Sequence, residues 1–432
     1  MVGGGPVGTA TAWQLGERAS EMDEPESVVL VHDPKNPGAH EDWSRLARLS
    51  FDGPKEEMDL SRHAIELLDL VDEVRSYASG PPVVPLRPGM LSLASPGTPM
   101  AKACAYAEEN YGDAEFVRRH PSELESVFPG NEFTLPEDTL CWSHPIGYCV
   151  SPIELCTTQL KTAEAYGVDV KEAIADIDMD GDLVKVTLSS GEEYTTKKCY
   201  LFAGAQNGEI LENSIKRDEA KNADLDVPEF DNTYITAIST VRYAHVNHPA
   251  QPAEGSGHVV TPITLGQLEI PGLIDFQANF SIVAEEYGDV LKTRLSGSIG
   301  TEVIPYAKEV NANINHEDDA KMADIYQNFF GALFPFLDTR KPLDFNRCVT
   351  YRNHGAQFSG TSIVEKPVGD GDASLLTTVG CFGVGVKFGP ALGEAAAAHV
   401  HSDELQTGMH VFQSGDEDLM NTDLGEKIER AW

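Results

Sequence analysis

The chain has 432 residues, of which 41% are apolar, which is enough for a sizeable core in one large domain or in two interleaved ones. Acidic residues outnumber basic ones 69 to 32, so the formal net charge is −37, as in a solvated acidic surface of the kind a salty habitat favours. Such a surface repels nucleic acid and anionic membranes, and no apolar run reaches the roughly 18 residues of a membrane span. We therefore expect neither nucleic acid nor a membrane as a partner.

The seven cysteines are scattered, and no C-x-x-C pair occurs. This pattern disfavours a disulfide framework and a zinc site, and with no visible signal peptide it predicts a reducing, cytoplasmic location. Two histidine pairs, His245/His248 and His399/His401, lack a third ligand at suitable spacing. We expect no metal site.

The N-terminal segment Gly3-Gly4-Gly5-Pro6-Val7-Gly8 matches G-x-G-x-x-G, and a stretch of helical character follows it. Glycines permit a tight turn and a close approach of backbone N–H groups to a pyrophosphate, and the helix N-terminus adds favourable partial charge. A strand over 28–31 then ends at His32-Asp33, where an acid can accept ribose hydroxyls. The pattern predicts a dinucleotide site, without separating FAD from NAD, at Gly3, Gly5, Pro6, Val7, Gly8 and Asp33. A purely structural glycine turn is the alternative, and only Met1 and Val2 stand where a first strand is expected.

The middle of the chain alternates between helix and strand patterns. A helix is expected over 56–74, and Ser151 as N-cap with Pro152 at the first position predicts another, through about Tyr166. Strand-like runs over 168–205 are separated by turns at Asp180-Gly181 and Ser190-Gly191. Residues 230–340 are strand-rich, and a strand, a turn and a helix follow. The mixture predicts two domains whose pieces alternate in the sequence.

In this order, seven segments together resemble the D-amino-acid-oxidase superfamily of FAD enzymes, and most closely its monomeric-sarcosine-oxidase-like branch. The segments are GGGPVG (3–8), VVLVHDP (28–34), SRLARLSFD (44–52), GYCVSPIEL (147–155), YLFAGA (200–205), RCVTY (347–351) and GCFGVGVKFG (380–389). The resemblance spans nearly the whole chain and is loosest over 80–140 and 230–340.

The resemblance implies a mixed α/β (α+β) fold. In it, a Rossmann-like FAD-binding domain of the glutathione-reductase/hydroxybenzoate-hydroxylase type is interleaved with an antiparallel-sheet substrate domain. The FAD-binding domain is expected over residues 1–78, 145–228 and 340–432, and the substrate-binding domain over 79–144 and 229–339.

The resemblance also selects FAD over NAD and implies further cofactor contacts. The turn at Ala203 and Gly204 would lie against FAD, and Arg45 would lie near the flavin. Cys348 falls where the branch has a cysteine bonded covalently to the flavin; a small buried core residue is the alternative. A C-terminal glycine-rich loop would run past the flavin ring, with a helix after it, and its contact residues would be Gly383, Gly385, Val386 and Lys387.

Three cations take implied catalytic roles. Arg48 and Lys387 occupy family positions that bind the substrate carboxylate, where an arginine forms two parallel hydrogen bonds and a lysine adds a point charge. Lys292 aligns with a lysine that promotes reduction of O2, although the histidine found four residues later in the family is Ser296 here. The alternatives are a solvated loop lysine for Lys387, a structural ion pair for Arg48 and a solvated strand lysine for Lys292.

The implied activity is that of an FAD-dependent oxidase of an anionic secondary or N-methyl amino acid. Hydride transfer to flavin N5 would give an imine, and O2 as acceptor would give H2O2. A phosphonate or a sulfonate would satisfy the same cations as a carboxylate. Two alternatives stay open: an FAD dehydrogenase that passes electrons to a quinone or a carrier, and a non-catalytic FAD-binding subunit. An NAD-linked dehydrogenase would leave 347–351 and 380–389 unexplained.

Overall fold

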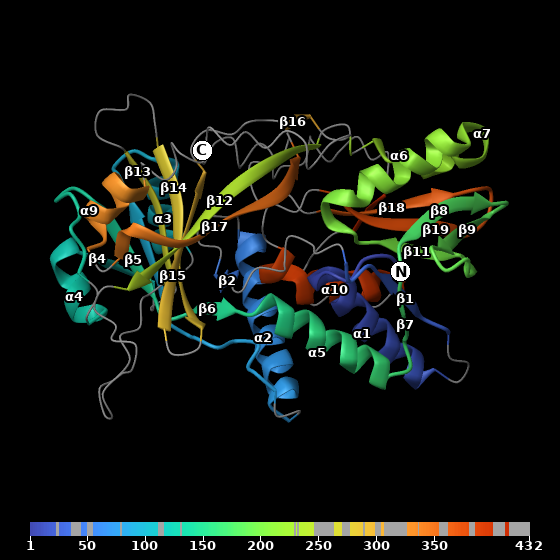
Figure 1. Cartoon of the computed structure of the whole chain (residues 1–432), viewed down its shortest axis with the longest axis horizontal. Helices are drawn as coiled ribbons and strands as arrows, with labels where there is room; N and C mark the ends of the chain where they lie inside the picture. The colour runs from blue at the N-terminus through green and yellow to red at the C-terminus, as the bar shows by residue number, and fades with distance from the viewer. Residues whose placement is uncertain are drawn as a thin grey trace.

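The structure is a computed structural model in which a large β-sheet and a group of smaller sheets lie at opposite ends, with helices between them (Figure 1). It describes residues 1–22, 26–35, 45–49, 55–77, 80–110, 116–129, 132–228, 230, 233–245, 263–269, 277–287, 290–298, 304–305, 326–335, 337–353, 362–379, 385–400 and 411–413.

A mostly parallel sheet is centred on the residues that precede the glycines. Val2 pairs in parallel with Val31 of β1 (Val29–His32) on one side and with Leu201 of β11 (Lys198–Leu201) on the other. The expected first strand is therefore reduced to a single bridged residue, and it still joins the two halves of the sheet. The outer strands are β7 (Asp169–Glu172), next to β1, and then β19 (Ala373–Val379), β18 (Ser362–Val368) and β20 (Val411–Gln413), beyond β11.

Helices pack together against one face of this sheet. They are α1 (Pro6–Glu21), α2 (Lys55–Tyr77), α5 (Pro152–Ala165) and α10 (Gly385–Val400). The predicted start of α5 is confirmed, because the Ser151 hydroxyl accepts a hydrogen bond from the Glu154 N–H at 3.3 Å and Pro152 is the first helical residue. The predicted helix over 56–74 is confirmed as α2.

Two glycines bring α10 against α1. A Cβ added at Gly389 would lie 2.7 Å from Cβ of Pro6, and one added at Gly393 would lie 2.4 Å from Cβ of Ala10. Real Cβ atoms do not approach this closely, so only glycine permits this spacing between the helices. The packing places the N-terminal turn of α10 beside the glycine turn at the start of the chain.

The other face of the sheet carries a three-stranded antiparallel sheet of β8 (Ala175–Asp180), β9 (Leu183–Leu188) and β10 (Glu193–Thr196). The predicted turns between them are confirmed, with positive φ at Gly181 and Gly191. Ile177, Val186 and Leu375 belong to the buried core between the two sheets. The sheet thus has helices on one face and strands on the other, as expected for the predicted FAD-binding fold.

The large sheet combines strands from distant parts of the sequence. Strands from 79–144 and from 229–339 share it, and its pairings are antiparallel except that β3 pairs in parallel with β13. That pair departs from the expected antiparallel sheet, which is possible because no hairpin joins these two distant strands. The strands are β3 (Met90–Ala94), β4 (Val117–Arg119), β5 (Leu140–His144), β12 (Thr233–His245), β13 (Ile263–Glu269), β14 (Gln277–Tyr287), β15 (Val290–Ser298), β16 (Ile304–Pro305) and β17 (Leu337–Asn353).

The predicted domain boundary at 340 falls inside β17, which pairs with β12 along most of its length. The division into two discontinuous domains stays a prediction. The remaining described elements are β2 (Arg45–Arg48), β6 (Gly147–Val150), α3 (Pro99–Asn110), α4 (Leu124–Val127), α6 (Asn207–Arg217), α7 (Glu219–Asn222), α9 (Gly331–Leu333), the 3₁₀ turns η1 (Pro121–Glu123), η2 (Gly204–Gln206) and η3 (Ala223–Leu225), and the π-helical turn η5 (Tyr326–Phe330).

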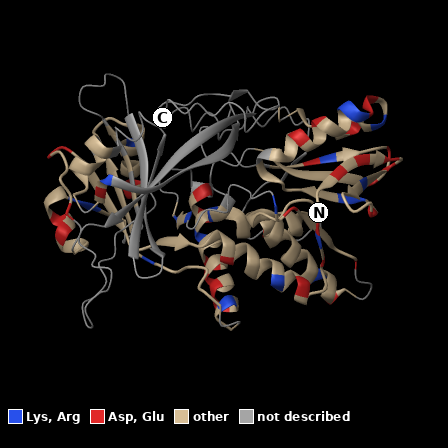
Figure 2. Ribbon diagram, in the orientation of Figure 1, with Lys and Arg blue, Asp and Glu red and all other residues tan. Residues whose placement is uncertain are grey.

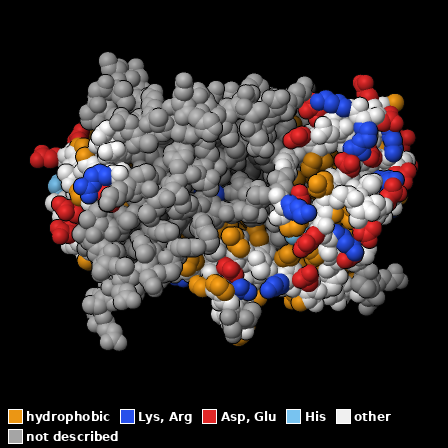
Figure 3. All heavy atoms as spheres, viewed as in Figure 1, with side chains coloured by type: hydrophobic (Ala, Val, Ile, Leu, Met, Phe, Trp, Pro, Cys, Tyr) orange, Lys and Arg blue, Asp and Glu red, His pale blue; other side chains and the backbone are white. Residues whose placement is uncertain are grey.

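Charged side chains of both signs cover the end of the molecule that carries β8, β9, α6 and α7 (Figures 2 and 3). Within the described ranges, no helix combines the length and the apolar character needed to cross a bilayer.

A buried carboxylate ties α10 to the parallel sheet. Glu365 of β18 accepts hydrogen bonds from Lys198 Nζ at 2.9 Å and pairs with His399 Nε2 of α10 at 2.6 Å. Burial alone would raise the pKa of Glu365, but the hydrogen bonds from His399, Ser374 and Lys198 outweigh it and lower the pKa to about 2. A carboxyl group whose pKa is depressed by folding stabilises the protein above its ordinary pKa and loses that contribution as the pH falls.

Replacing Glu365 with Gln should therefore lower the free energy of unfolding by about 2 kcal/mol at neutral pH. The difference from wild type should shrink as the pH falls from about 4.5, its ordinary value, toward about 2. Urea denaturation at a series of pH values measures it. Glu172→Gln, at an exposed position of β7, is the control and should show a small difference throughout. A Glu365→Gln difference that stays constant on acidification would contradict the assignment.

Candidate cofactor and substrate site

The glycine turn at the start of the chain depends on two glycines. Gly3 has a φ of +123°, and a Cβ there would lie 2.3 Å from the carbonyl oxygen of Phe202. A Cβ at Gly8 would lie 2.0 Å from the carbonyl oxygen of Gly3. Larger residues would open the turn, so both positions require glycine.

The turn leads directly into the N-terminus of α1. Gly5 is the N-cap and Pro6 the first helical residue, and in the described part of the chain no side chain caps this end. The first N–H groups of a helix have no partner within it and carry partial positive charge. Together with the glycines, they form a cradle that suits the diphosphate of a dinucleotide.

The side chain that lies against this turn is His32. A Cβ on Gly4 would lie 2.6 Å from Cβ and 3.2 Å from Nδ1 of His32. Nε2 of His32 is buried and, among the described residues, has no hydrogen-bond partner. Asp33 instead accepts a hydrogen bond from the N–H of Lys35 at 3.0 Å. The ribose role of Asp33 stays a prediction.

The residues present fit a dinucleotide such as FAD. The cradle has room only for backbone, and beside it the buried Nε2 of His32 offers a hydrogen bond that a ribose hydroxyl can complete. The sequence analysis did not single out His32. The signal that could have indicated it is its position at the end of the strand, directly before Asp33.

Arg45 and Arg48 begin and end β2, which pairs in antiparallel with β6, so that Arg48 lies opposite Gly147. Both arginines are half-buried, and Nη1 of Arg48 donates to the carbonyl of Leu49 at 2.9 Å. Strand β2 packs against α10, and Ala47 and Val386 are buried in the same core. The elements that carry Arg48 and Lys387 are therefore neighbours.

Lys387 differs from its predicted setting. The sequence suggests a loop, but α10 already begins at Gly385, so Lys387 lies in the first helical turn. It is 5% exposed, with Nζ 3.8 Å from Oε1 of Glu57 and 4.3 Å from the ring centroid of Phe388. The run of glycines suggested a flexible loop. In the structure, Gly389 and Gly393 lie within α10 and allow it to pack closely against α1. The alternative of a solvated lysine is wrong.

The predicted turn at Ala203 and Gly204 also lies at the cradle. The backbone N of Ala203 would be 2.7 Å from a Cβ on Gly3, and Gly204 has a φ of +65°. Turn η2, which begins at Gly204, packs against β17, the strand that carries Cys348. The backbone of Cys348 is in register with Ile238 of β12. Its bond to the flavin stays a prediction.

The remaining predicted residues are placed less completely. Lys292 lies in β15, in register with Ala244 of β12 and Glu285 of β14. Val386 is buried next to Lys387. Gly383 lies outside the described residues.

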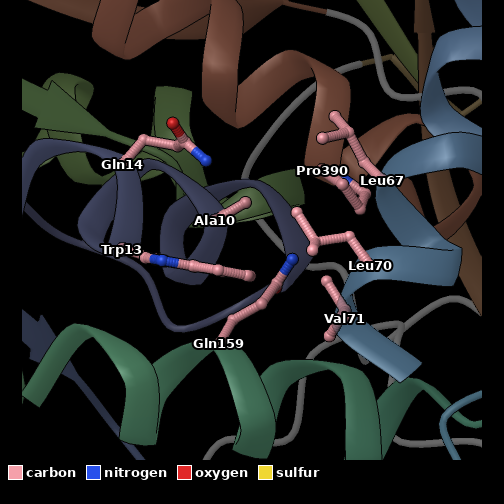
Figure 4. Close-up of a pocket in the computed structure, with 8 residues that line it drawn as sticks. All are labelled: Ala10, Trp13, Gln14, Leu67, Leu70, Val71, Gln159 and Pro390. Atoms are coloured by element: carbon pink, nitrogen blue, oxygen red, sulfur yellow. The ribbon is translucent and has the colours of Figure 1, made fainter. Parts of the chain in front are cut away.

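A small pocket lies away from these residues, among α1, α2, α5 and α10 (Figure 4). Trp13, Val71 and Pro390 are among its lining, and none of the predicted site residues belongs to it.

The described cysteine side chains are all buried and form no disulfide with one another, and they are Cys104, Cys141, Cys149, Cys156 and Cys199. Burial raises the pKa of Cys141 to about 12, so this thiol is not poised as a nucleophile. Over the ranges that the structure describes, no three His, Cys, Asp or Glu side chains are grouped to hold a metal ion. The cytoplasmic location stays a prediction.

The parallel strands, the glycine turn and the helix that follows it are typical of dinucleotide-binding proteins. Residues 1–399 match the family described as DAO, FAD dependent oxidoreductase. The chain belongs to this family, so the resemblance to the superfamily is confirmed and FAD is its cofactor. The match excludes the reading as an NAD-linked dehydrogenase. No curated protein matches the sequence.

Solved structures share the fold at low sequence identity. NikD, titled an unusual amino acid oxidase essential for nikkomycin biosynthesis, is 17% identical, with a TM-score of 0.70 over 96% of each chain. Glycine oxidase from Bacillus cereus is 14% identical, with a TM-score of 0.65 over 94% of this chain and 97% of that one. L-proline dehydrogenase from P. horikoshii is 15% identical, with a TM-score of 0.63 over 94% of both.

We expect the contact at Gly4 to make His32 the more important of the two strand-end residues for cofactor binding. His32→Ala should weaken FAD binding by about tenfold, because a buried hydrogen bond and its packing are lost. Asp33→Asn, which keeps the size of the side chain, should weaken it by less. Flavin content and FAD titration of the apoprotein by fluorescence measure both. A larger loss of FAD affinity in Asp33→Asn than in His32→Ala would indicate that Asp33, and not His32, contacts the ribose.

Proposed function

We propose that the protein is an FAD-dependent oxidase of an anionic secondary or N-methyl amino acid. The observation that carries this proposal is the packing of β2 against α10, which brings the elements bearing Arg48 and Lys387 together beside the glycine cradle. Two basic side chains beside the cofactor would suit a substrate with a negatively charged group.

In this proposal, the chain binds and orients the substrate. The guanidinium of Arg48 takes the carboxylate through two parallel hydrogen bonds, and the ammonium of Lys387 adds charge from the first turn of α10. Fixing the carboxylate fixes the neighbouring Cα–H and amine, which saves the entropy of positioning at the moment of reaction. When bound, FAD supplies the two-electron acceptor for oxidation of the C–N bond to an imine.

The names of the structural neighbours support the reaction class without fixing the substrate. NikD and glycine oxidase are titled oxidases of amino acids, whereas the neighbour from P. horikoshii is titled a dehydrogenase of L-proline. The second candidate is therefore an FAD-dependent dehydrogenase that passes electrons to a quinone or a carrier.

Covalent attachment of the flavin through Cys348 is also proposed. Flavin released into solution on acid denaturation would exclude this bond.

The test of substrate binding is an anaerobic screen of flavin bleaching against N-methyl, cyclic and sulfonated amino acids. Once a substrate is found, Arg48→Met should raise KM by about 100-fold, because a buried ion pair with the substrate is lost. Arg340→Met, at an exposed position, is the control and should leave KM unchanged. An unchanged KM in Arg48→Met would remove Arg48 from the site. No bleaching by any amino acid would favour the non-catalytic subunit.

The choice between oxidase and dehydrogenase rests on Lys292. A fixed positive charge near the site stabilises the negative charge that develops on O2 during its reduction. Lys292→Met should therefore slow flavin reoxidation by about tenfold or more, with little change in the rate of anaerobic reduction. Stopped-flow mixing of the reduced protein with O2 measures the first rate. Equal effects on both half-reactions would remove this role, and slow reoxidation of the wild type would favour the dehydrogenase.

A further inference from the structure

We propose that Gln159 of α5 and Thr9 of α1 position the glycine cradle for the diphosphate of FAD. The inference concerns the cofactor, which follows from membership of the family, and it does not depend on the identity of the substrate. Its observation is a buried hydrogen bond between two helices, formed by residues outside the predicted site.

The two side chains form a polar contact inside an apolar core. Oγ1 of Thr9 donates to Oε1 of Gln159 at 2.8 Å, across 150 positions of the sequence, and both residues are 1% exposed. The core that α1 and α5 share contains Ala12, Trp13 and Leu155. A neutral pair of this kind adds little net stability over apolar side chains of the same size, but it specifies one relative placement of the two helices.

Thr9 connects this contact to the cradle. Its backbone N and its Oγ1 lie 2.9 Å and 3.1 Å from the carbonyl oxygen of Gly5, which is the N-cap of α1. Because Gly5 has no side chain, it cannot cap the helix itself. A contact that fixes Thr9 therefore also fixes the turn whose N–H groups would face the diphosphate.

Packing alone restrains one motion of α1 only weakly. Helix α10 approaches α1 through Gly389 and Gly393, which meet Pro6 and Ala10. Small residues allow close approach, but they present few projections that resist rotation of a helix about its own axis. A directional hydrogen bond from α5 resists that rotation, and so it sets the direction of the first N–H groups of α1.

The far end of the Gln159 side chain faces a pocket, which allows the contact to be altered without crowding. Gln159 lines the small pocket among the four helices, and its amide nitrogen points into it (Figure 4). Gln159→Met conserves the approximate size of the side chain and removes the acceptor. The Thr9 hydroxyl then still has the carbonyl of Gly5 as an acceptor.

The test separates stability from cofactor affinity. Thr9→Val leaves Oε1 of Gln159 buried without its donor and should lower the melting temperature. Thr9→Val combined with Gln159→Met removes both polar groups and should return the melting temperature close to that of wild type. We expect this double variant to bind FAD about tenfold more weakly all the same, because the cradle is no longer held in its binding geometry.

Two ligands locate the effect at the diphosphate. FAD binding is measured by fluorescence titration of the apoprotein. ADP, which carries the adenosine and the diphosphate without the flavin, is measured by calorimetry. The double variant should lose affinity for ADP by a factor similar to that for FAD, because both ligands place a diphosphate in the cradle.

Two further variants are controls. Thr9→Ser keeps the hydroxyl and should keep the FAD affinity of wild type. Thr158→Val removes a buried hydroxyl from the residue next to Gln159, where it donates to the carbonyl of Glu154 within α5. Since that hydrogen bond does not reach α1, its loss should leave the affinity for FAD unchanged.

Wild-type affinity for FAD and ADP in a stable double variant would overturn the inference. An affinity that falls and recovers together with the melting temperature across the variants would do the same, because it would show a structural role alone. If the double variant does not fold, Gln159→Met by itself decides: weaker binding of both ligands supports the inference, and unchanged binding contradicts it.

Discussion

The close contact between α1 and α10 is the constraint on which the site depends. It joins residues near the two ends of the described chain, and it exists because Gly389 and Gly393 allow backbone to meet Pro6 and Ala10. The contact sets where Lys387 lies relative to the glycine cradle. It also places α10 against both β2 and α2, so one helix brings Arg48, Glu57 and the cradle into one neighbourhood. The positions of these charged residues thus follow from steric packing.

The electrostatics of α10 extend this point. Three residues along the helix form ion pairs with residues of other elements. Lys387 pairs with Glu57, Glu394 with His63, and His399 with Glu365. The strongly negative composition did not predict these ion pairs, because a composition sums over the whole chain and does not say where a carboxylate lies. The carboxylates that matter lie between elements, where water does not screen them.

Local patterns were enough to predict much of the fold. Ser151 and Pro152 define the start of α5, and the glycine turn with its following helix defines the cradle, because these signals depend on a few adjacent residues. Long-range contacts were less visible. Nothing in the sequence near Lys387 distinguishes a loop glycine from one that packs against α1, and nothing near residue 57 indicates a pairing 330 positions away. The sequence places His32 directly before Asp33, but only the approach of Gly4 shows that its side chain contacts the glycine turn.

The placement of α10 has a consequence for the order in which the protein can fold. Partners of this helix such as Pro6 and Glu365 precede it in the chain, and β20, which it also contacts, follows it. A nascent chain that has not yet emerged through residue 400 has the glycine turn and α1 but lacks the helix that packs against α1. The contact between α1 and α10 therefore forms after translation of α10, and its long range in the sequence places it among the late events of folding.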